Sequence, residues 1–440
     1  MSVVLPAADA RPAEAATPRA DWFGHPRGLT ILFLTEMWEK FSYFGMRALL
    51  VYYMTKALAI PQAQASWIYG SYTAFAYFTP IVGGLIADRL LGRRKAVILG
   101  GSIMAIGHFL MMFESLFYPA LVIIALGNGL FLPSLPSQVQ TLYEPTDPRR
   151  ITAYNVYYVG INLGGMLAPL ICGTLGELLG WHWGFGAAGV GMCIGLVIYV
   201  VGGRYLPSAV LNARARDVAT TAERHSFGKR IGLLLAVVAI VVVYRGAYEQ
   251  TGNTVALWAD SAVDRSVGQG WTIPSTWFQA LNPLLVFILT PVLLFIWRRG
   301  ARPDREFSPL RRMAGGALIV ALSYMLLAAV AQISHLTGAP AHWIWLVLFF
   351  IVYTTGELLI LPTGLALFGQ LAPSTLAATI IALWFSASFA GNLLAGAIGT
   401  LWSRFDNTIF FVLVAVVAAV AATMLLLLDR PARRVLSDER

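Results

Sequence analysis

Long apolar stretches recur along the chain, separated by short polar or Gly/Pro-containing turns. A helix that crosses a bilayer needs about 20 mostly apolar residues, and each of these stretches is long enough. The pattern predicts twelve membrane-spanning helices, at 28–56, 66–89, 96–117, 120–143, 151–179, 183–205, 231–259, 277–298, 311–335, 341–369, 375–402 and 408–428. The longest polar interruption divides them into six and six.

This spacing predicts an all-α polytopic membrane protein with two six-helix halves, at 28–206 and 231–428. The other segments are predicted to be a disordered cytoplasmic N-terminal tail at 1–27, a cytoplasmic linker at 207–230 and a cytoplasmic tail at 429–440. Two six-helix halves around a central site are typical of secondary transporters, in which the halves rock to open the site to each side in turn.

Composition agrees with a bilayer as the solvent, since 58% of the residues are hydrophobic and only 12% are charged. The net charge of +9 comes from Lys and Arg in loops on alternate sides of the helices, whereas the opposite loops hold only Lys56, Arg265 and Arg404. Because positive loops stay cytoplasmic, we expect both termini in the cytoplasm, in a bacterial-type inner membrane. Scattered cations of this kind do not form a nucleic-acid-binding patch.

Nothing in the sequence favours an enzyme, because no metal-spaced His/Cys set, nucleophile elbow or phosphate loop occurs. Cys172 and Cys193 lie in apolar helices, so we expect neither a disulfide nor a metal site. We expect the protein to need no cofactor, with the proton as a coupling ion.

The first predicted helix carries charges that a bilayer disfavours, at about 2.5–3.5 kcal/mol each on insertion scales. Glu36, Lys40, Tyr43 and Arg47 share one helical stripe, and Glu39 lies beside it. Structural ion pairing alone is one explanation. The surplus of carboxylates favours another, because neighbouring carboxylates with few cations keep one carboxyl protonated.

Two further helices carry charges. Arg245, Glu249 and Asn253 share one face of the seventh. Glu357 in the tenth stands nearly alone, so it must be protonated or meet a partner from another helix or a substrate. We favour an ammonium partner for Glu357. Asn162 lies in a glycine-containing run of the fifth helix, where helices can approach closely.

The loop after the second helix resembles the G-x-x-x-D-R-x-x-G-R-R motif of the major facilitator superfamily. The matching residues are Gly84, Asp88, Arg89, Gly92, Arg93 and Arg94. The resemblance implies that superfamily's fold and a gating loop, in which the charges form a relay that locks the cytoplasmic side.

Several runs together resemble the proton-dependent oligopeptide transporter family. The first helix is similar to its E-x-x-E-R-F-x-Y-Y-G-M-R pattern from Glu36 to Arg47. The other similar runs are Ile161-Asn162-Leu163-Gly164, Tyr248-Glu249-Gln250-Thr251-Gly252, the stretch from Gly356 to Leu365, and the stretch from Trp384 to Asn392.

This resemblance implies a dipeptide or tripeptide held between the halves. The residues implied in substrate binding are Lys40 and Arg47 for its carboxylate, Glu357 for its amino terminus with Asn162, Asn282 and Ser388 nearby, Tyr43 and Tyr77 for its backbone, and Trp384 for a side-chain pocket. The residues implied in proton coupling are Glu36, Glu39, Lys40 and Glu249.

The sequence departs from the family pattern at four positions. Lys40 replaces an arginine, Phe44 a tyrosine, and Leu132 the lysine of a G-L-x-K-P-N segment. Arg245 stands where the family has tryptophan. We hypothesise that Arg245 relocates the missing positive charge, pairs with Glu249 or a first-helix carboxylate, and takes part in coupling.

The expected function is import of dipeptides and tripeptides with protons by alternating access, by a monomer whose partners are the peptide, the proton and the bilayer. An alternative is a transporter of another anion, amino acid or peptide-like conjugate with altered or lost proton coupling, which the changes at Lys40 and Leu132 favour. An alternative of another class is a membrane sensor that does not transport.

Overall fold

The computed structural model describes residues 24–144, 146–207, 221–268, 270–300, 308–371 and 377–437. Twelve helices in these ranges have 18 residues or more: α1 Arg27–Tyr52, α2 Gln62–Ile86, α3 Arg93–Leu110, α4 Phe117–Ser134, α6 Arg149–Leu178, α7 Trp181–Gly202, α8 Thr221–Tyr248, α10 Leu281–Gly300, α11 Pro309–Thr337, α12 Ile344–Leu371, α13 Ala377–Gly399 and α14 Asn407–Ser437.

Short elements join or extend these helices. They are α5 Pro136–Thr141, α9 Thr254–Ser261, the π-helical turns η1 Tyr53–Ala57 and η2 Ala87–Leu91, and the 3-10 turns η3 Glu114–Leu116, η4 Gly203–Tyr205, η5 Glu249–Gly252 and η6 Ser275–Ala280. Two-residue strands, β1 Val263–Asp264 and β2 Ala341–His342, pair in parallel, Val263 opposite Ala341.

Ten helical segments in the described ranges are long and apolar enough to cross a membrane. Neither α1 nor α3 is among them, and both are rich in charge, since α1 carries Glu36, Glu39, Lys40 and Arg47 and α3 begins with three basic residues. The chain is an integral membrane protein. That α1 and α3 also cross, which makes twelve, stays a prediction.

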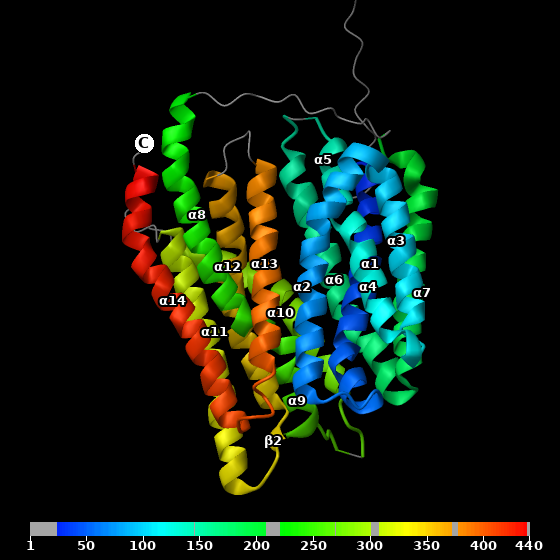
Figure 1. Ribbon diagram of the computed structural model, residues 1–440, viewed down its shortest axis with the longest axis vertical. Helices are drawn as coiled ribbons and strands as arrows, with labels where there is room; N and C mark the ends of the chain where they lie inside the picture. Colours follow the sequence, from blue (N-terminus) through cyan, green and yellow to red (C-terminus); the bar gives the residue numbers. More distant parts are fainter. Residues whose placement is uncertain are drawn as a thin grey trace, which may run out of the picture.

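The helices form two bundles that stand side by side, α1 to α7 and α8 to α14 (Figure 1). One buried apolar cluster runs through the second bundle, and two others fill the first. Across the boundary, α2 packs against α13 and α6 against α10. Glycines allow the first approach, because a Cβ on Gly70 would lie 2.4 Å from the Cα of Gly396.

Two predicted boundaries between helix and polar segment differ from the structure. Helix α8 begins at Thr221, so the last ten residues of the predicted linker at 207–230 are helical. Helix α14 runs to Ser437, into the predicted tail at 429–440. The α8 extension contains Glu, Lys and Arg, and the α14 extension contains Asp and three Arg. Arg, Lys and Glu are good helix formers, but charged residues end an apolar pattern. Residues 1–23 and 208–220, on which the tail and linker predictions mainly fall, lie outside the described residues.

The start of α1 is fixed to the segment between α5 and α6. His25 lies within the predicted disordered tail at 1–27, yet it is buried and its Nδ1 is 2.7 Å from the hydroxyl of Tyr143. Burial and the neighbouring Arg149 hold the pKa of His25 below its usual range. The Gly24 carbonyl accepts a hydrogen bond from Arg149 at 3.2 Å. Order therefore begins before residue 28.

Candidate functional site

A cavity of about 240 Å³ lies between the two bundles. Its walls come from α1, α2, α6, the α8–η5 junction, η6, α10 and α12. Its polar lining is Arg47, Tyr77, Tyr158, Asn162, Arg245, Tyr248, Glu249, Thr251, Gln279, Asn282, Tyr353 and Glu357. A pocket that contains both arginines and both carboxylates can hold a ligand with charges of both signs.

Two guanidiniums share one carboxylate on the cavity wall, and we call Arg47, Arg245 and Glu249 the arginine cluster. An Arg47 Nη2 lies 2.5 Å from Glu249 Oε2, and an Arg245 Nη1 lies 2.9 Å from Glu249 Oε1. The Arg47, Arg245 and Glu249 side chains are 13%, 7% and 3% exposed. The Arg245–Glu249 ion pair is one of the two pairings that we hypothesised for Arg245. With two guanidiniums and one carboxylate, the cluster has a net charge of one positive unit.

A break in the predicted seventh helix places Glu249. The prediction at 231–259 is one helix, but α8 ends at Tyr248 and a 3-10 turn follows from Glu249 to Gly252. Broken helices at the centre of the membrane are common at transporter binding sites. Gly252 lets the break approach α2, since a Cβ there would lie 2.1 Å from the Tyr69 hydroxyl. That hydroxyl accepts a hydrogen bond from Arg47 Nε at 2.7 Å.

Arg245 is held on three sides. Its guanidinium carbon lies 5.4 Å from the ring centre of Tyr77 and 5.9 Å from that of Tyr248, within cation–π range. Gly391 on α13 leaves room for it, because a Cβ there would be 2.4 Å from the Arg245 Cβ. The Nε of Arg245 is buried and has no hydrogen-bond partner in the described residues.

Glu357 faces the same cavity from α12 and is 9% exposed. Neutral groups donate to it: the Tyr248 hydroxyl at 2.8 Å to Oε1, and the Asn282 amide at 2.5 Å to Oε2. Asn282 also donates to the Thr354 hydroxyl at 3.0 Å. A carboxylate held by neutral donors keeps its capacity to bind a cationic ligand group.

A second charged group lies on α1, beyond the cavity wall, and we call Glu36 and Glu39 the α1 carboxylate pair. Lys40 Nζ lies 2.6 Å from Glu39 Oε2 and 3.5 Å from Glu36 Oε1. Both glutamates are at most 1% exposed. Glu36 Oε2 and Glu39 Oε1 have no hydrogen-bond partner in the described residues. Here acid outnumbers base.

The structure divides the residues that the sequence implicated in substrate binding. Arg47, Tyr77, Asn162, Asn282 and Glu357 line the cavity. The described lining does not contain Lys40, Tyr43, Trp384 or Ser388.

Helical geometry explains part of this division. Lys40 and Arg47 are seven residues apart, which is about 10 Å along a helix, and Lys40 pairs with Glu39 whereas Arg47 pairs with Glu249. Trp384 packs edge-on against Phe368, with ring centres 5.1 Å apart. Ser388 lies buried behind it, with its hydroxyl 3.4 Å from the Trp384 carbonyl. Their roles stay predictions.

The predicted gating loop is largely solvent-facing. Asp88 and Arg93 are 3.7 Å apart, with side chains 60% and 37% exposed, and such pairs contribute about 0–1 kcal/mol. Arg93 also donates to the Ser137 carbonyl of α5 at 3.1 Å. Gly92 ends the helix with φ of 74°, which favours glycine. The described contacts of Arg93 stay within the first bundle.

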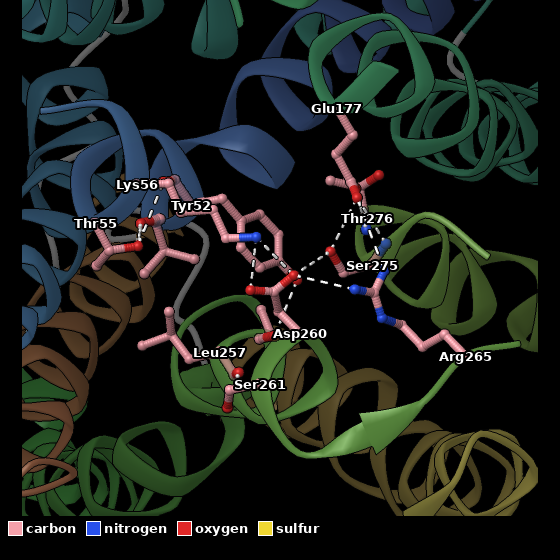
Figure 2. A network of polar contacts seen from close by, with 12 residues as sticks. Tyr52, Thr55, Lys56, Glu177, Leu257, Asp260, Ser261, Arg265, Ser275 and Thr276 are labelled. Carbon is pink, nitrogen blue, oxygen red and sulfur yellow. Dashed lines mark hydrogen bonds and ion pairs between the residues drawn. The ribbon is translucent and has the colours of Figure 1, made fainter. Parts of the chain in front are cut away.

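The two bundles are joined at the end that carries α9 and β2, which we call the α9 end (Figures 1 and 2). Asp260 of α9 lies 2.7 Å from Lys56 Nζ and 3.3 Å from Arg265 Nη2, and it accepts from Ser275 at 3.2 Å. The Ser275 amide and hydroxyl donate to Glu177 of α6, both at 3.0 Å. No sequence pattern indicated Asp260, Glu177 or Ser275, although Lys56 and Arg265 were predicted to lie on this side of the helices.

Other bonds close the same end. Tyr52 donates to the Ala256 carbonyl at 3.0 Å, and Ser66 donates to Asn253 at 2.9 Å. The Gln279 amide donates to the Ala48 carbonyl at 3.1 Å. These contacts join the first bundle to η6 and to the turn around α9, so the structure is closed at the α9 end.

Comparison with known proteins decides the family. A sequence model of the POT family matches residues 94–215 and 206–417. The chain belongs to the POT family. Among POT relatives, the "Di-/tripeptide transporter" of Lactococcus lactis subsp. cremoris is 31% identical, and the match covers 95% of this chain and 98% of that relative.

Solved POT structures share the fold. A crystal structure of a peptide transporter POT in complex with sulfate has a TM-score of 0.85 at 29% identity and covers 96% of this chain and 98% of that chain. A POT family transporter in complex with 5-aminolevulinic acid has a TM-score of 0.81 at 25% identity, covering 93% and 97%. The predicted fold class and the family resemblance are confirmed, and the named relatives are transporters.

Proposed function

We propose that this chain transports dipeptides and tripeptides together with protons by alternating access. The arrangement of charge in the cavity carries the proposal: surplus guanidinium charge lies on one wall and Glu357 on another. The carboxylate of a zwitterionic peptide would meet Arg47 and Arg245, and its ammonium would meet Glu357. The Lactococcus relative named as a di-/tripeptide transporter supports this substrate class.

Charge balance supports coupling of binding to closure. A zwitterion that neutralises the arginine cluster and Glu357 lets the bundles close around the cavity without burying unpaired charge. No cofactor other than the proton is needed, and we propose that a monomer suffices. The α1 carboxylate pair, with two carboxylates beside Lys40, offers a place for that proton.

We propose that both termini lie in the cytoplasm of a bacterial-type inner membrane. The distribution of Lys and Arg supports this orientation. The α9 end would then face outward, and the contacts there would close the cavity toward the outside. A membrane potential negative inside adds about 2.3 kcal/mol per imported charge per 100 mV.

Uptake into proteoliposomes tests the proposal. Purified protein is reconstituted, and radiolabelled Ala-Ala is supplied outside under an imposed pH gradient, acid outside. We expect the dipeptide to accumulate above its outside concentration and a protonophore to abolish this. Ala-Ala that merely equilibrates, whatever the gradient, contradicts coupling, and Ala-Ala that does not enter contradicts the substrate class.

A second candidate is a carrier of amino acids or peptide-like conjugates on the same scaffold. Arg245 in the cavity favours it, because a second guanidinium suits anionic groups that need not belong to a peptide. The POT relative in complex with 5-aminolevulinic acid shows such a ligand on this fold. Uptake of labelled 5-aminolevulinic acid and uptake of labelled Ala-Ala, each measured with the other compound as unlabelled competitor, distinguish the two.

A further inference from the structure

The counter-ions of Glu249 are arranged to keep it ionised. Each of its carboxylate oxygens lies against a different guanidinium, Oε1 against Arg245 and Oε2 against Arg47. A proton on Glu249 would leave two buried like charges beside a neutral group, which is strongly unfavourable. If Arg47 turns away toward a ligand, Arg245, four residues earlier on α8, still pairs with Glu249.

The titratable and charged groups around Glu249 come from five helices. They are Tyr43 and Arg47 on α1, Tyr69 and Tyr77 on α2, Tyr244, Arg245 and Tyr248 on α8, Tyr324 on α11, and Glu357 on α12, which accepts a hydrogen bond from Tyr248. Glu357 is the one other acid in this set of described neighbours, and it accepts from Tyr248 and Asn282. The balance of charge around Glu249 is therefore positive.

The α1 carboxylate pair has the opposite balance. Its described charged and titratable neighbours are Lys40 on the same helix, Tyr72 on α2, and Tyr157 and Tyr158 on α6. One ammonium serves two carboxylates, and Glu36 Oε2 and Glu39 Oε1 are buried without a hydrogen-bond partner. A shared proton on this pair removes the surplus negative charge.

We propose that Arg245 holds Glu249 ionised through the transport cycle, so that the Glu36–Glu39 pair carries the coupling proton and the arginine cluster is left to bind an anionic group of the substrate. This deepens the proposed function and rests on it. Arg245 acts here as a positioning residue for Glu249 and gives the cavity a second guanidinium. The absence of a side chain at Gly391 leaves space for Arg245, and the rings of Tyr77 and Tyr248 orient its guanidinium.

Two variants provide the test, one in the arginine cluster and one in the α1 carboxylate pair. Arg245→Gln/Glu249→Gln deletes one ion pair from the arginine cluster, and Glu39→Gln deletes the surplus acid on α1. Proteoliposomes report pH-driven accumulation of Ala-Ala at saturating concentration, and exchange of labelled for unlabelled Ala-Ala without a gradient.

We expect the double variant to need more Ala-Ala but to accumulate it in response to the gradient. We expect Glu39→Gln to exchange Ala-Ala but to lose accumulation. A double variant that exchanges without accumulating overturns the inference, because Glu249 would then carry the proton. Wild-type protein that accumulates no dipeptide contradicts the proposed function instead.

Infrared spectroscopy of the purified, full-length protein gives a readout that does not need transport. A protonated carboxylic acid has a carbonyl band apart from that of carboxylate. We expect Glu39→Gln to remove such a band from the wild-type spectrum and Arg245→Gln/Glu249→Gln to leave it. Loss of the band in the double variant, or its persistence in Glu39→Gln, overturns the inference even if a variant transports nothing.

Discussion

The two charged clusters near the centre of this protein have opposite compositions. On α1, Glu36 and Glu39 share Lys40 outside the cavity lining. On the cavity wall, Arg47 and Arg245 share Glu249. The first has an acid too many and suits a proton, whereas the second has a base too many and suits an anion. Under the proposed function, this difference in net charge would place the proton and the peptide at separate sites.

Removal of the single base from the α1 cluster should have the largest effect. Lys40→Met leaves two buried carboxylates without a cation, and breaking a buried pair in this way costs about 3–5 kcal/mol. Thermal unfolding of the detergent-purified protein should show a strongly lowered midpoint. Arg245→Gln is the matched control, because it leaves a balanced Arg47–Glu249 pair and should cost about 1 kcal/mol, as an average point mutation does. Equal losses would mean that the clusters do not differ.

Arg47→Gln should come next, through substrate affinity. Truncating one partner of a buried charge pair costs about 2–5 kcal/mol, which is roughly 30-fold or more in KM for Ala-Ala. Arg245→Gln should raise KM less, because Arg47 keeps its bond to Tyr69 and stays in place. Transport kinetics in proteoliposomes measure both. A larger KM increase for Arg245→Gln would reverse the assigned order of the two arginines.

The sequence was sufficient for the α1 cluster but not for the arginine cluster. Glu36, Glu39 and Lys40 lie within five residues, so helical periodicity alone brings them together. The bond from Arg47 to Glu249 joins residues 202 positions apart. The break at Glu249 was also hidden, because its segment contains no proline and reads as more of the same helix.

Other parts of the site depend on tertiary contacts in a similar way. The cavity partners of Glu357, which are Tyr248 and Asn282, lie 109 and 75 positions away. Apolar length predicted the twelve long helices well, since bilayer thickness sets it. It could not predict that charged turns would extend α8 and α14, nor which residues pair at the α9 end.

Substrate charge should separate the two clusters with a smaller effect. In wild-type protein, Ala-Glu should compete with labelled Ala-Ala better than the isosteric Ala-Gln does, by about three- to tenfold, because a charge-assisted hydrogen bond is roughly twice as strong as a neutral one. Arg245→Gln should remove this preference, whereas Glu39→Gln should keep it when exchange is measured. A preference that survives Arg245→Gln would place the second anion site elsewhere.

The smallest effect is expected at the α9 end. Asp260→Asn weakens the contacts to Lys56 and Arg265, which are partly exposed pairs of about 0.2–1 kcal/mol each. A cysteine in place of Gln279, in the cavity, should then react up to about fivefold faster with an impermeant maleimide added outside. Asp88→Asn is the control and should leave the rate unchanged. Equal labelling rates in the cysteine reporter alone, with Asp260→Asn and with Asp88→Asn would show that the Asp260 contacts do not keep this end closed.

The close approach of Gly391 to Arg245 has a consequence for protein engineering. Gly391 belongs to the stretch that resembles the POT family motif, so a relative with a glycine at that position already contains the space an arginine needs. An arginine could therefore be introduced into such a relative at the position of Arg245 by a single substitution, without a compensating change on the facing helix. Conversely, the methyl group added by Gly391→Ala would fill that space and displace the Arg245 side chain.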